Sequence, residues 1–134
     1  MKPFIKNSIT LKNSEKRKTV VIGASDNTER YSYLAVLNLY KGGHEVEAVG
    51  IKEGEVDGIK IQTGFPEIKD VDTVTIYVGA KNQPSWYDYI LSLKPNRIIF
   101  NPGAENPEFE KIASEKGIEV TVACTLVMLS IGNY

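Results

Sequence analysis

The fold is decided by one stretch of the chain, Thr19-Val20-Val21-Ile22-Gly23-Ala24-Ser25-Asp26-Asn27, which continues to Arg30-Tyr31-Ser32. Its first four residues form a β-branched run of the kind that is buried on both faces of a parallel sheet, and a glycine ends the run. Residues 31–41 then predict a helix rich in Leu and Ala, closed by Gly42-Gly43. A buried strand that leads through small residues into a helix is typical of an α/β domain.

The same alternation continues to the end of the chain. Further strands are predicted at residues 45–49, 58–62, 73–78, 97–100 and 118–122, with helices at 84–94 and 107–116 and a loop at 50–57. Asn106 and Pro107 suit the N-cap and first position of the last helix. We therefore predict an α/β, Rossmann-like, doubly wound and mostly parallel sheet of five to six strands, with helices on both faces.

Length and charge suggest a basic leader before a single domain. The chain has 134 residues, and residues 1–18 carry six basic groups against one acid, which leaves 10 basic and 16 acidic residues in the remainder. We expect a flexible leader at 1–17 and one domain at 18–134. The acidic body argues against nucleic-acid binding, and no apolar run is long enough for a membrane span or a secretory signal. We expect a cytoplasmic protein.

The residues after the first strand have the features of a phosphate loop. In sheets of this type ligands bind beyond the carboxyl ends of the strands, which selects the loops at residues 23–30, 50–57 and 79–83. Small residues allow close backbone approach, and a helix N-terminus attracts anions. The alternative is a tight, capped turn without a ligand. The candidate cofactor-binding residues are Gly23, Ala24, Ser25, Arg30, Tyr31, Ser32, Gly50, Ile51, Lys52, Val78 and Gly79.

The loop lacks the full pattern of a dinucleotide-binding site. Only Gly23 of the three glycines in G-x-G-x-x-G is present, and the second predicted strand ends in Val49-Gly50-Ile51-Lys52 without an acid for the ribose diol. A lysine there suits an extra ribose phosphate better than a free diol. NAD(P) or another nucleotide, held by a regulatory domain, remains the alternative ligand.

Three segments together resemble a known family. Gly23-Ala24-Ser25, Arg30-Tyr31-Ser32 and the turn Gly42-Gly43-His44-Glu45-Val46 resemble the small stand-alone CoA-binding domain proteins. That family is similar in fold to the CoA-binding domain of the succinyl-CoA synthetase alpha subunit, and the resemblance covers residues 18–132. It implies a Rossmann-like fold with the ADP part of coenzyme A over the first loop and the loop after the second strand, and it implies a ligand without a reaction. We therefore predict non-catalytic binding of coenzyme A or an acyl-CoA. Gly23, Ala24, Ser25, Arg30 and Ser32 would face phosphates, and Gly50, Ile51 and Lys52 would lie near the adenosine. Many relatives carry Val-Asn-Pro where this chain has Val49-Gly50-Ile51.

No catalytic or metal site is predicted. His44, the single histidine, is expected on the surface at the end of the sheet opposite the cleft, so it cannot activate Cys124, the single cysteine. An enzyme acting on the thioester, with residues that the sequence does not locate, remains a third possibility.

Aromatic side chains and one loop leave further roles open. Trp86, Ile90 and Leu93 share one helix face. Tyr87 and Tyr89, with Tyr31 and Tyr33, would line either a pantetheine channel or a contact with a protein partner or second copy, whereas the simpler interpretation is a helix packed on the sheet. The loop at 101–106 is either a capped turn or a contact for the thiol end of a ligand.

Overall fold

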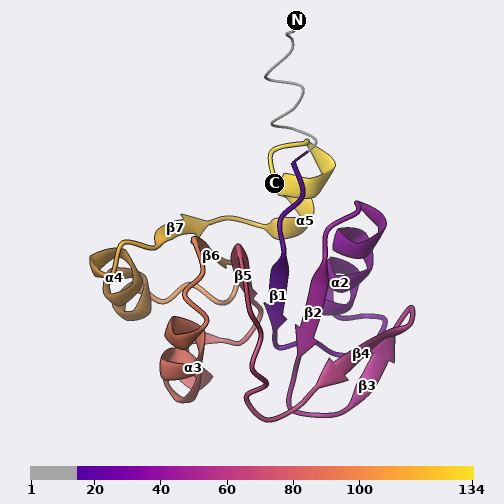
Figure 1. The fold of residues 1–134 in the computed structure, drawn as a ribbon, viewed down its shortest axis with the longest axis horizontal. Helices are drawn as coiled ribbons and strands as arrows, with labels where there is room; N and C mark the ends of the chain where they lie inside the picture. Colours follow the sequence, from indigo (N-terminus) through magenta and orange to yellow (C-terminus); the bar gives the residue numbers. More distant parts are fainter. Residues whose placement is uncertain (1–14) are drawn as a thin grey trace, which may run out of the picture.

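A computed structural model describes residues 15–134, so residues 1–14 of the predicted leader lie outside the described part. Strands and helices alternate along the described residues (Figure 1). The strands are β1 (Thr19–Ile22), β2 (Val46–Val49), β3 (Gly54–Val56), β4 (Ile59–Gln62), β5 (Thr73–Ile76), β6 (Arg97–Phe100) and β7 (Glu119–Val122). The helices are α2 (Tyr31–Lys41), α3 (Tyr87–Ser92), α4 (Pro107–Glu115) and α5 (Thr125–Ser130), with 3-10 turns η1 (Ala80–Asn82) and η2 (Pro84–Trp86).

The strands form one sheet in the order β3-β4-β2-β1-β5-β6-β7. All neighbours pair in parallel except β3 and β4, and Ile22 at the end of β1 pairs with Val49 on one side and Ile76 on the other. Without β3, this is the strand order of doubly wound nucleotide-binding sheets, in which the connection reverses direction between β1 and the next strand unit, here β5. The prediction of a mostly parallel α/β sheet is confirmed, but the predicted five to six strands are wrong, because the sheet has seven.

The additional strand, β3, lies in the segment that we predicted as a loop. It pairs antiparallel with β4 through a tight hairpin at Asp57-Gly58, whose φ angles are 50° and 90°. Positive φ at both central residues is the requirement of a two-residue type I′ turn, and Asp-Gly satisfies it.

Two helical details also differ from the prediction. The segment from Pro84 begins as a 3-10 turn, and the α-helix starts only at Tyr87. The short helix α5 was not predicted, because Cys124 at its N-cap makes no side-chain capping bond that a sequence pattern would reveal. By contrast, Asn106 caps α4 as predicted, and its side chain accepts a hydrogen bond from the backbone N–H of Phe109 at 3.2 Å.

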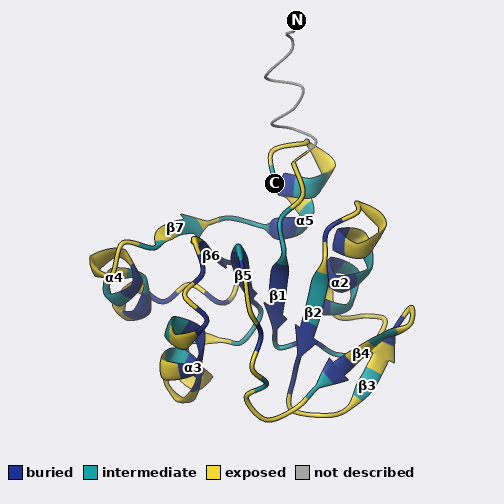
Figure 2. Cartoon of the chain, viewed as in Figure 1, coloured by how far each residue is buried: buried dark blue, intermediate teal, exposed yellow. Residues whose placement is uncertain are grey.

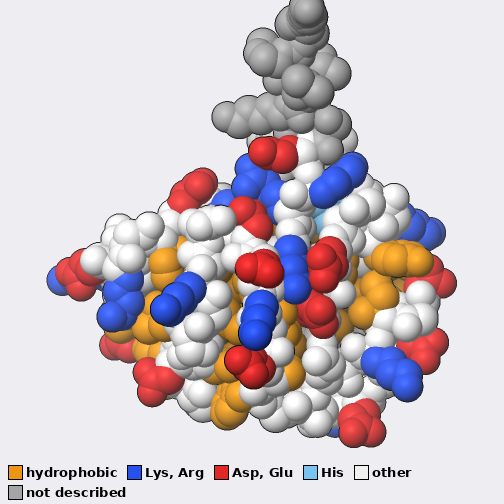
Figure 3. All heavy atoms as spheres, viewed as in Figure 1, with side chains coloured by type: hydrophobic (Ala, Val, Ile, Leu, Met, Phe, Trp, Pro, Cys, Tyr) orange, Lys and Arg blue, Asp and Glu red, His pale blue; other side chains and the backbone are white. Residues whose placement is uncertain are grey.

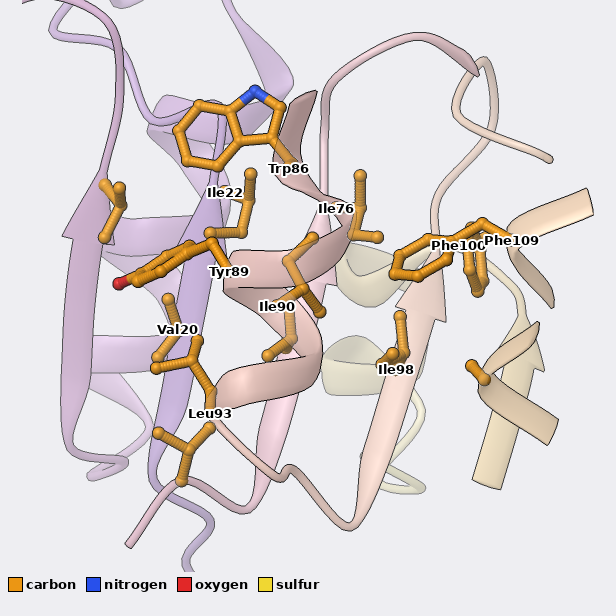
Figure 4. Close-up of a cluster of buried hydrophobic side chains, with 14 of the residues drawn as sticks. Val20, Ile22, Ile76, Trp86, Tyr89, Ile90, Leu93, Ile98, Phe100 and Phe109 are labelled. Atoms are coloured by element: carbon orange, nitrogen blue, oxygen red, sulfur yellow. The ribbon is translucent and has the colours of Figure 1, made fainter. Parts of the chain in front are cut away.

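Helices cover both faces of the sheet, as predicted. Val20 and Ile22 of β1 point into the core beneath α3 and α4, where they meet Trp86, Tyr89 and Ile90 (Figure 4). Val21 points to the opposite face, toward the core beneath α2. β1 is therefore buried throughout, while parts of α2 and α4 remain exposed (Figure 2).

The carboxyl ends of β1 and β2 point away from the chain termini (Figure 1). Helix α5 and the end of the chain lie beyond the amino end of β1, where the hydroxyl groups of Tyr134 and Thr19 are 2.6 Å apart. Acidic and basic side chains are interspersed over the face seen in Figure 3. Within residues 15–134, no helix is long and apolar enough to cross a bilayer.

Candidate binding cleft

A cleft of about 820 Å³ opens at the carboxyl edge of the sheet, between the loops that follow β1, β2 and β5. These are the three loops that the sequence analysis predicts to bind a ligand. The cleft is lined by Gly23, Ala24, Ser25, Asp26, Asn27, Arg30, Ile51, Lys52, Tyr77, Val78, Gly79, Lys81, Asn82, Pro84, Ser85 and Trp86. Eight of the eleven candidate residues are therefore brought together; Tyr31, Ser32 and Gly50 are not among the lining residues.

The loop after β1 is tied to the end of β2. The backbone N–H groups of Gly23 and Ala24 both donate to the carbonyl oxygen of Val49, at 2.9 and 3.0 Å. Gly23 has a φ of +92°, and a Cβ atom there would lie 3.1 Å from a methyl carbon of Val78. The first two amides of the loop thus make hydrogen bonds within the protein and are not free to bind a ligand. Amides available to a ligand come later in the segment, at Ser25, Asp26 and Thr28, because those of Asn27, Glu29 and Arg30 are bonded within the loop.

The remainder of this loop is shaped by its own side chains. Ser25 Oγ accepts from the backbone N–H of Asn27 at 3.0 Å, and Asn27 Oδ1 accepts from the backbone N–H of Glu29 at 3.0 Å. Short Ser and Asn side chains favour such local turns. They hold an irregular segment in one conformation ahead of α2.

The N-terminus of α2 adjoins the cleft without a side-chain cap. Arg30 is its N-cap residue, but the Arg30 side chain makes no capping bond, and the first turn contains no acid. Unpaired N–H groups and the helix dipole favour an anion at such an end. Of the other two candidates here, the Ser32 side chain is buried, with 3% exposed, whereas Tyr31 is 72% exposed.

The end of β2 contributes both a close contact and exposed side chains. Gly50 is buried, and a Cβ atom at this position would clash with the carbonyl oxygen of Ala24. The next residues, Ile51 and Lys52, are exposed and line the cleft. Gly50 therefore shapes the site from beneath rather than facing into it.

The loop after β5 is held by Gln83, which is fully buried. Gln83 Nε2 donates to the carbonyl oxygens of Val78 at 2.8 Å and Ala104 at 2.7 Å, and its Oε1 accepts from Asn106 Nδ2 at 2.9 Å. This network fixes the positions of Val78 and Gly79. The sequence predicts Gln83 at the end of a loop, and no sequence pattern indicates that its side chain would be buried and would hold this loop in place.

The charges lining the cleft are mostly positive. Arg30, Lys52 and Lys81 are cationic, and Asp26 is the one acid among the lining residues. A cleft with this balance suits an anionic ligand, and guanidinium groups bind phosphate oxygens well.

Comparison with known proteins agrees with this architecture. The profile of the family described as CoA binding domain matches residues 17–130. The chain belongs to the CoA-binding domain family. This membership confirms the resemblance stated above. No curated protein matches the chain.

Solved structures of similar proteins share the fold over nearly their whole length. A crystal structure of an uncharacterised protein is 54% identical, with a TM-score of 0.87, covering 90% of this chain and 99% of that one. A hypothetical protein from Pyrococcus horikoshii OT3 is 21% identical, with a TM-score of 0.79 and coverage of 98% and 96%. A conserved hypothetical protein from Pyrococcus furiosus is 27% identical, with a TM-score of 0.68 and coverage of 78% and 91%.

His44 lies at the end of the sheet opposite the cleft, but the prediction of a surface position is wrong. Only 9% of His44 is exposed, and its Nδ1 accepts from the backbone N–H of Arg17 at 3.0 Å. Burial, followed by the charge of Lys16, lowers the pKa of His44. The segment before β1 packs over the imidazole, and the sequence carries no signal of that contact.

Cys124 is half-buried before α5 and does not line the cleft. Nearby, the Tyr77 hydroxyl is buried without a hydrogen-bond partner in the described part of the chain, and burial raises the pKa of Tyr77.

The loop after β6 does not line the cleft either. The side chain of its first residue, Asn101, makes hydrogen bonds within the protein: it donates to Thr75 Oγ1 at 2.6 Å and accepts from the backbone N–H of Thr125 at 2.9 Å.

None of the four tyrosines considered for a channel lines the cleft, whereas Trp86, predicted on the packed face of its helix, does. Tyr87 stacks on Phe109 with ring centroids 4.2 Å apart, and the side chain of Tyr89, also in α3, is buried. The interpretation of a helix packed on the sheet therefore holds for Tyr87 and Tyr89.

Proposed function

We propose that this chain binds coenzyme A or an acyl-CoA without catalysing a reaction, with the phosphates held between the loop after β1 and the N-terminus of α2. The observation that carries the proposal is the uncapped, acid-free start of α2 beside a cleft that three cationic side chains line. The family match and the Rossmann-like strand order support it, because ligands of such sheets bind at this edge.

The lining residues favour one orientation of the ligand. The adenosine lies near Ile51 and Lys52, above Gly50, so that Lys52 is available to the 3′-phosphate. The pantetheine arm then runs past Val78 and Gly79 toward Trp86. In this arrangement α2 contributes backbone amides to the phosphates, while the buried Ser32 side chain supports the helix from within.

The test is calorimetric titration of the protein with CoA, dephospho-CoA and NAD. We expect CoA to bind with a Kd of about 1 μM, roughly 8 kcal/mol, and dephospho-CoA to bind about tenfold more weakly because it lacks the 3′-phosphate. NAD binding in preference to CoA would favour the dinucleotide alternative. If none of the three ligands bound measurably, the proposal would be overturned.

A matched pair of variants tests the place of binding. Ser25→Glu puts a carboxylate into the phosphate loop, and Ser114→Glu makes the same change at an exposed position on α4. CoA binding should be lost in the first variant and kept in the second. Equal binding by both variants would exclude the phosphate loop as the site.

The absence of catalysis is tested separately. Incubation with acetyl-CoA should release no free thiol above the rate in buffer. Hydrolysis that disappears in Cys124→Ala would instead favour the thioester-handling enzyme.

A further inference from the structure

A second groove, of about 1020 Å³, lies between the loop at residues 65–71 and helix α3. It joins the cleft at Ser85, which lines both. Trp86 lines the cleft on one side of this junction, and Tyr89 lines the groove on the other. The two depressions therefore adjoin each other at Ser85, one beside the phosphate loop and the other beside α3.

Three aromatic rings in mutual contact lie where the two depressions adjoin; we call Phe65, Trp86 and Tyr89 the aromatic ledge. The Phe65 ring lies edge-on to Trp86, with centroids 5.4 Å apart, and 5.1 Å from Tyr89. Tyr89 also donates its hydroxyl to the carbonyl oxygen of Pro66 at 2.6 Å, which fastens the Phe65 loop to α3. The ledge is thus a fixed structure.

Phe65 is the exposed member of the ledge. It is 60% exposed, whereas Trp86 and Tyr89 are 8% and 9% exposed. An exposed phenyl ring, held by two buried aromatic rings beside a cleft, offers apolar surface to whatever enters the groove.

The rest of the groove suits an uncharged chain. Its base is formed by apolar side chains that are almost fully buried, Ile68, Val71 and Leu93. Its rim carries charges of both signs: Glu67, Asp70 and Asp88 are acidic, and Lys69 and Lys94 are basic. The mixed rim gives no preference for an anion or a cation, in contrast to the cleft.

We propose that this groove binds the acyl group of an acyl-CoA, with Phe65 and Trp86 in contact with its first carbons. The inference rests on the proposed function: with the phosphates at α2, the pantetheine arm reaches Ser85 and Trp86, and the group attached to its sulfur continues into the groove. The preferred ligand is then a thioester of a medium-length apolar acid rather than free CoA.

The experiment compares CoA, acetyl-CoA and octanoyl-CoA on the wild-type protein and on Phe65→Ala, with Tyr40→Ala as control. Tyr40 is an exposed aromatic residue of α2 that lines neither depression. Calorimetry measures affinity, and the fluorescence of Trp86, the single tryptophan of the chain, reports contact at the junction. We expect octanoyl-CoA to bind at least about tenfold more tightly than CoA to the wild type and to Tyr40→Ala. This gain should disappear in Phe65→Ala, with CoA affinity unchanged.

The other outcomes separate the two proposals. CoA binding without any gain from the octanoyl group overturns the acyl groove and leaves the proposed function standing. An equal loss of CoA and octanoyl-CoA affinity in Phe65→Ala also overturns it, because the ledge would then bind the part common to both. Failure of every thioester and of CoA to bind overturns both proposals.

Discussion

Gly50 lies directly against the carbonyl oxygen of Ala24, so closely that a Cβ atom at residue 50 would clash with it. Val49, the preceding residue, accepts hydrogen bonds from the amides of Gly23 and Ala24. Two of the three loops around the cleft are therefore packed into one unit. This contact explains why a glycine directly follows β2.

Gly50→Ala should destabilise the protein by about 1–3 kcal/mol, because the added methyl group has to displace backbone rather than a flexible side chain. It would also meet Ile61 Cγ2 at 3.1 Å. Urea unfolding followed by circular dichroism measures the change.

Gly79→Ala is the control for this prediction. A Cβ atom at residue 79 would have Gly103 O at 3.8 Å as its nearest neighbour, which is an ordinary contact. We expect a change within about 0.5 kcal/mol. Equal stabilities of the two variants would contradict the tight packing of Gly50 on Ala24.

Arg30→Gln should weaken CoA binding by about tenfold, since a charge-assisted hydrogen bond to phosphate is lost. Lys41→Gln removes the same charge from the far end of α2, outside the cleft, and should leave the affinity unchanged. Titrations at low and high salt add a second readout, because the wild-type affinity should fall more steeply with salt than that of Arg30→Gln. Parallel salt dependences would exclude Arg30 from phosphate contact.

Much of the fold could be predicted from hydrophobic runs and glycine positions. The buried strand β1, the helix that follows it and the cap at Asn106 all depend on local chemistry that a sequence displays. The positions of the three cleft loops follow from the rule that parallel strands end at one edge. These features need no knowledge of distant contacts.

The environment of a side chain is harder to predict where it depends on residues that are distant in the sequence. The side chain of Ser32, a residue that we predict to face a phosphate, is buried. His44 is covered by the backbone of Arg17, a residue 27 positions away. By contrast, Asp57-Gly58 flanked by Val56 and Ile59 is a hairpin signal, and it would have predicted β3.

Gly58→Ala should destabilise the protein by about 1–2 kcal/mol, because φ at this position is +90° and L side chains rarely adopt it. Nothing lies within 4 Å of a Cβ atom there, so the cost is conformational rather than steric. Asp57→Asn, which keeps a residue tolerant of positive φ, is the matched control and should be neutral. Urea unfolding of both variants tests the turn, and a neutral Gly58→Ala would contradict it.

The stability of the protein should decrease as the pH falls below about 6.5, owing to His44. Burial and the neighbouring cationic groups, Lys16, Arg17 and Arg97, lower the pKa of His44 from its usual 6.5, while the hydrogen bond from the Arg17 amide acts in the opposite direction. The unfolded chain therefore binds more protons than the native protein between the native pKa and 6.5, so acid favours unfolding. The stabilisation of the native protein by neutral His44 is fully present above pH 6.5 and is lost as the pH falls toward the pKa of His44 in the native protein.

Urea unfolding at pH 8, 7, 6 and 5 measures this dependence, and His44→Gln is the informative variant because glutamine does not titrate. The wild-type free energy of unfolding should fall between pH 7 and pH 5, whereas that of His44→Gln should change less. Asp72, whose pKa is held below its usual 3.8 by hydrogen bonds from Thr73, Asn96 and Arg17 despite partial burial, adds its own loss only under more acidic conditions. The effects of His44 and Asp72 on stability are thus expected in different pH ranges. Identical slopes for wild type and His44→Gln above pH 5 would show that the imidazole is not held in its neutral form by the segment that covers it.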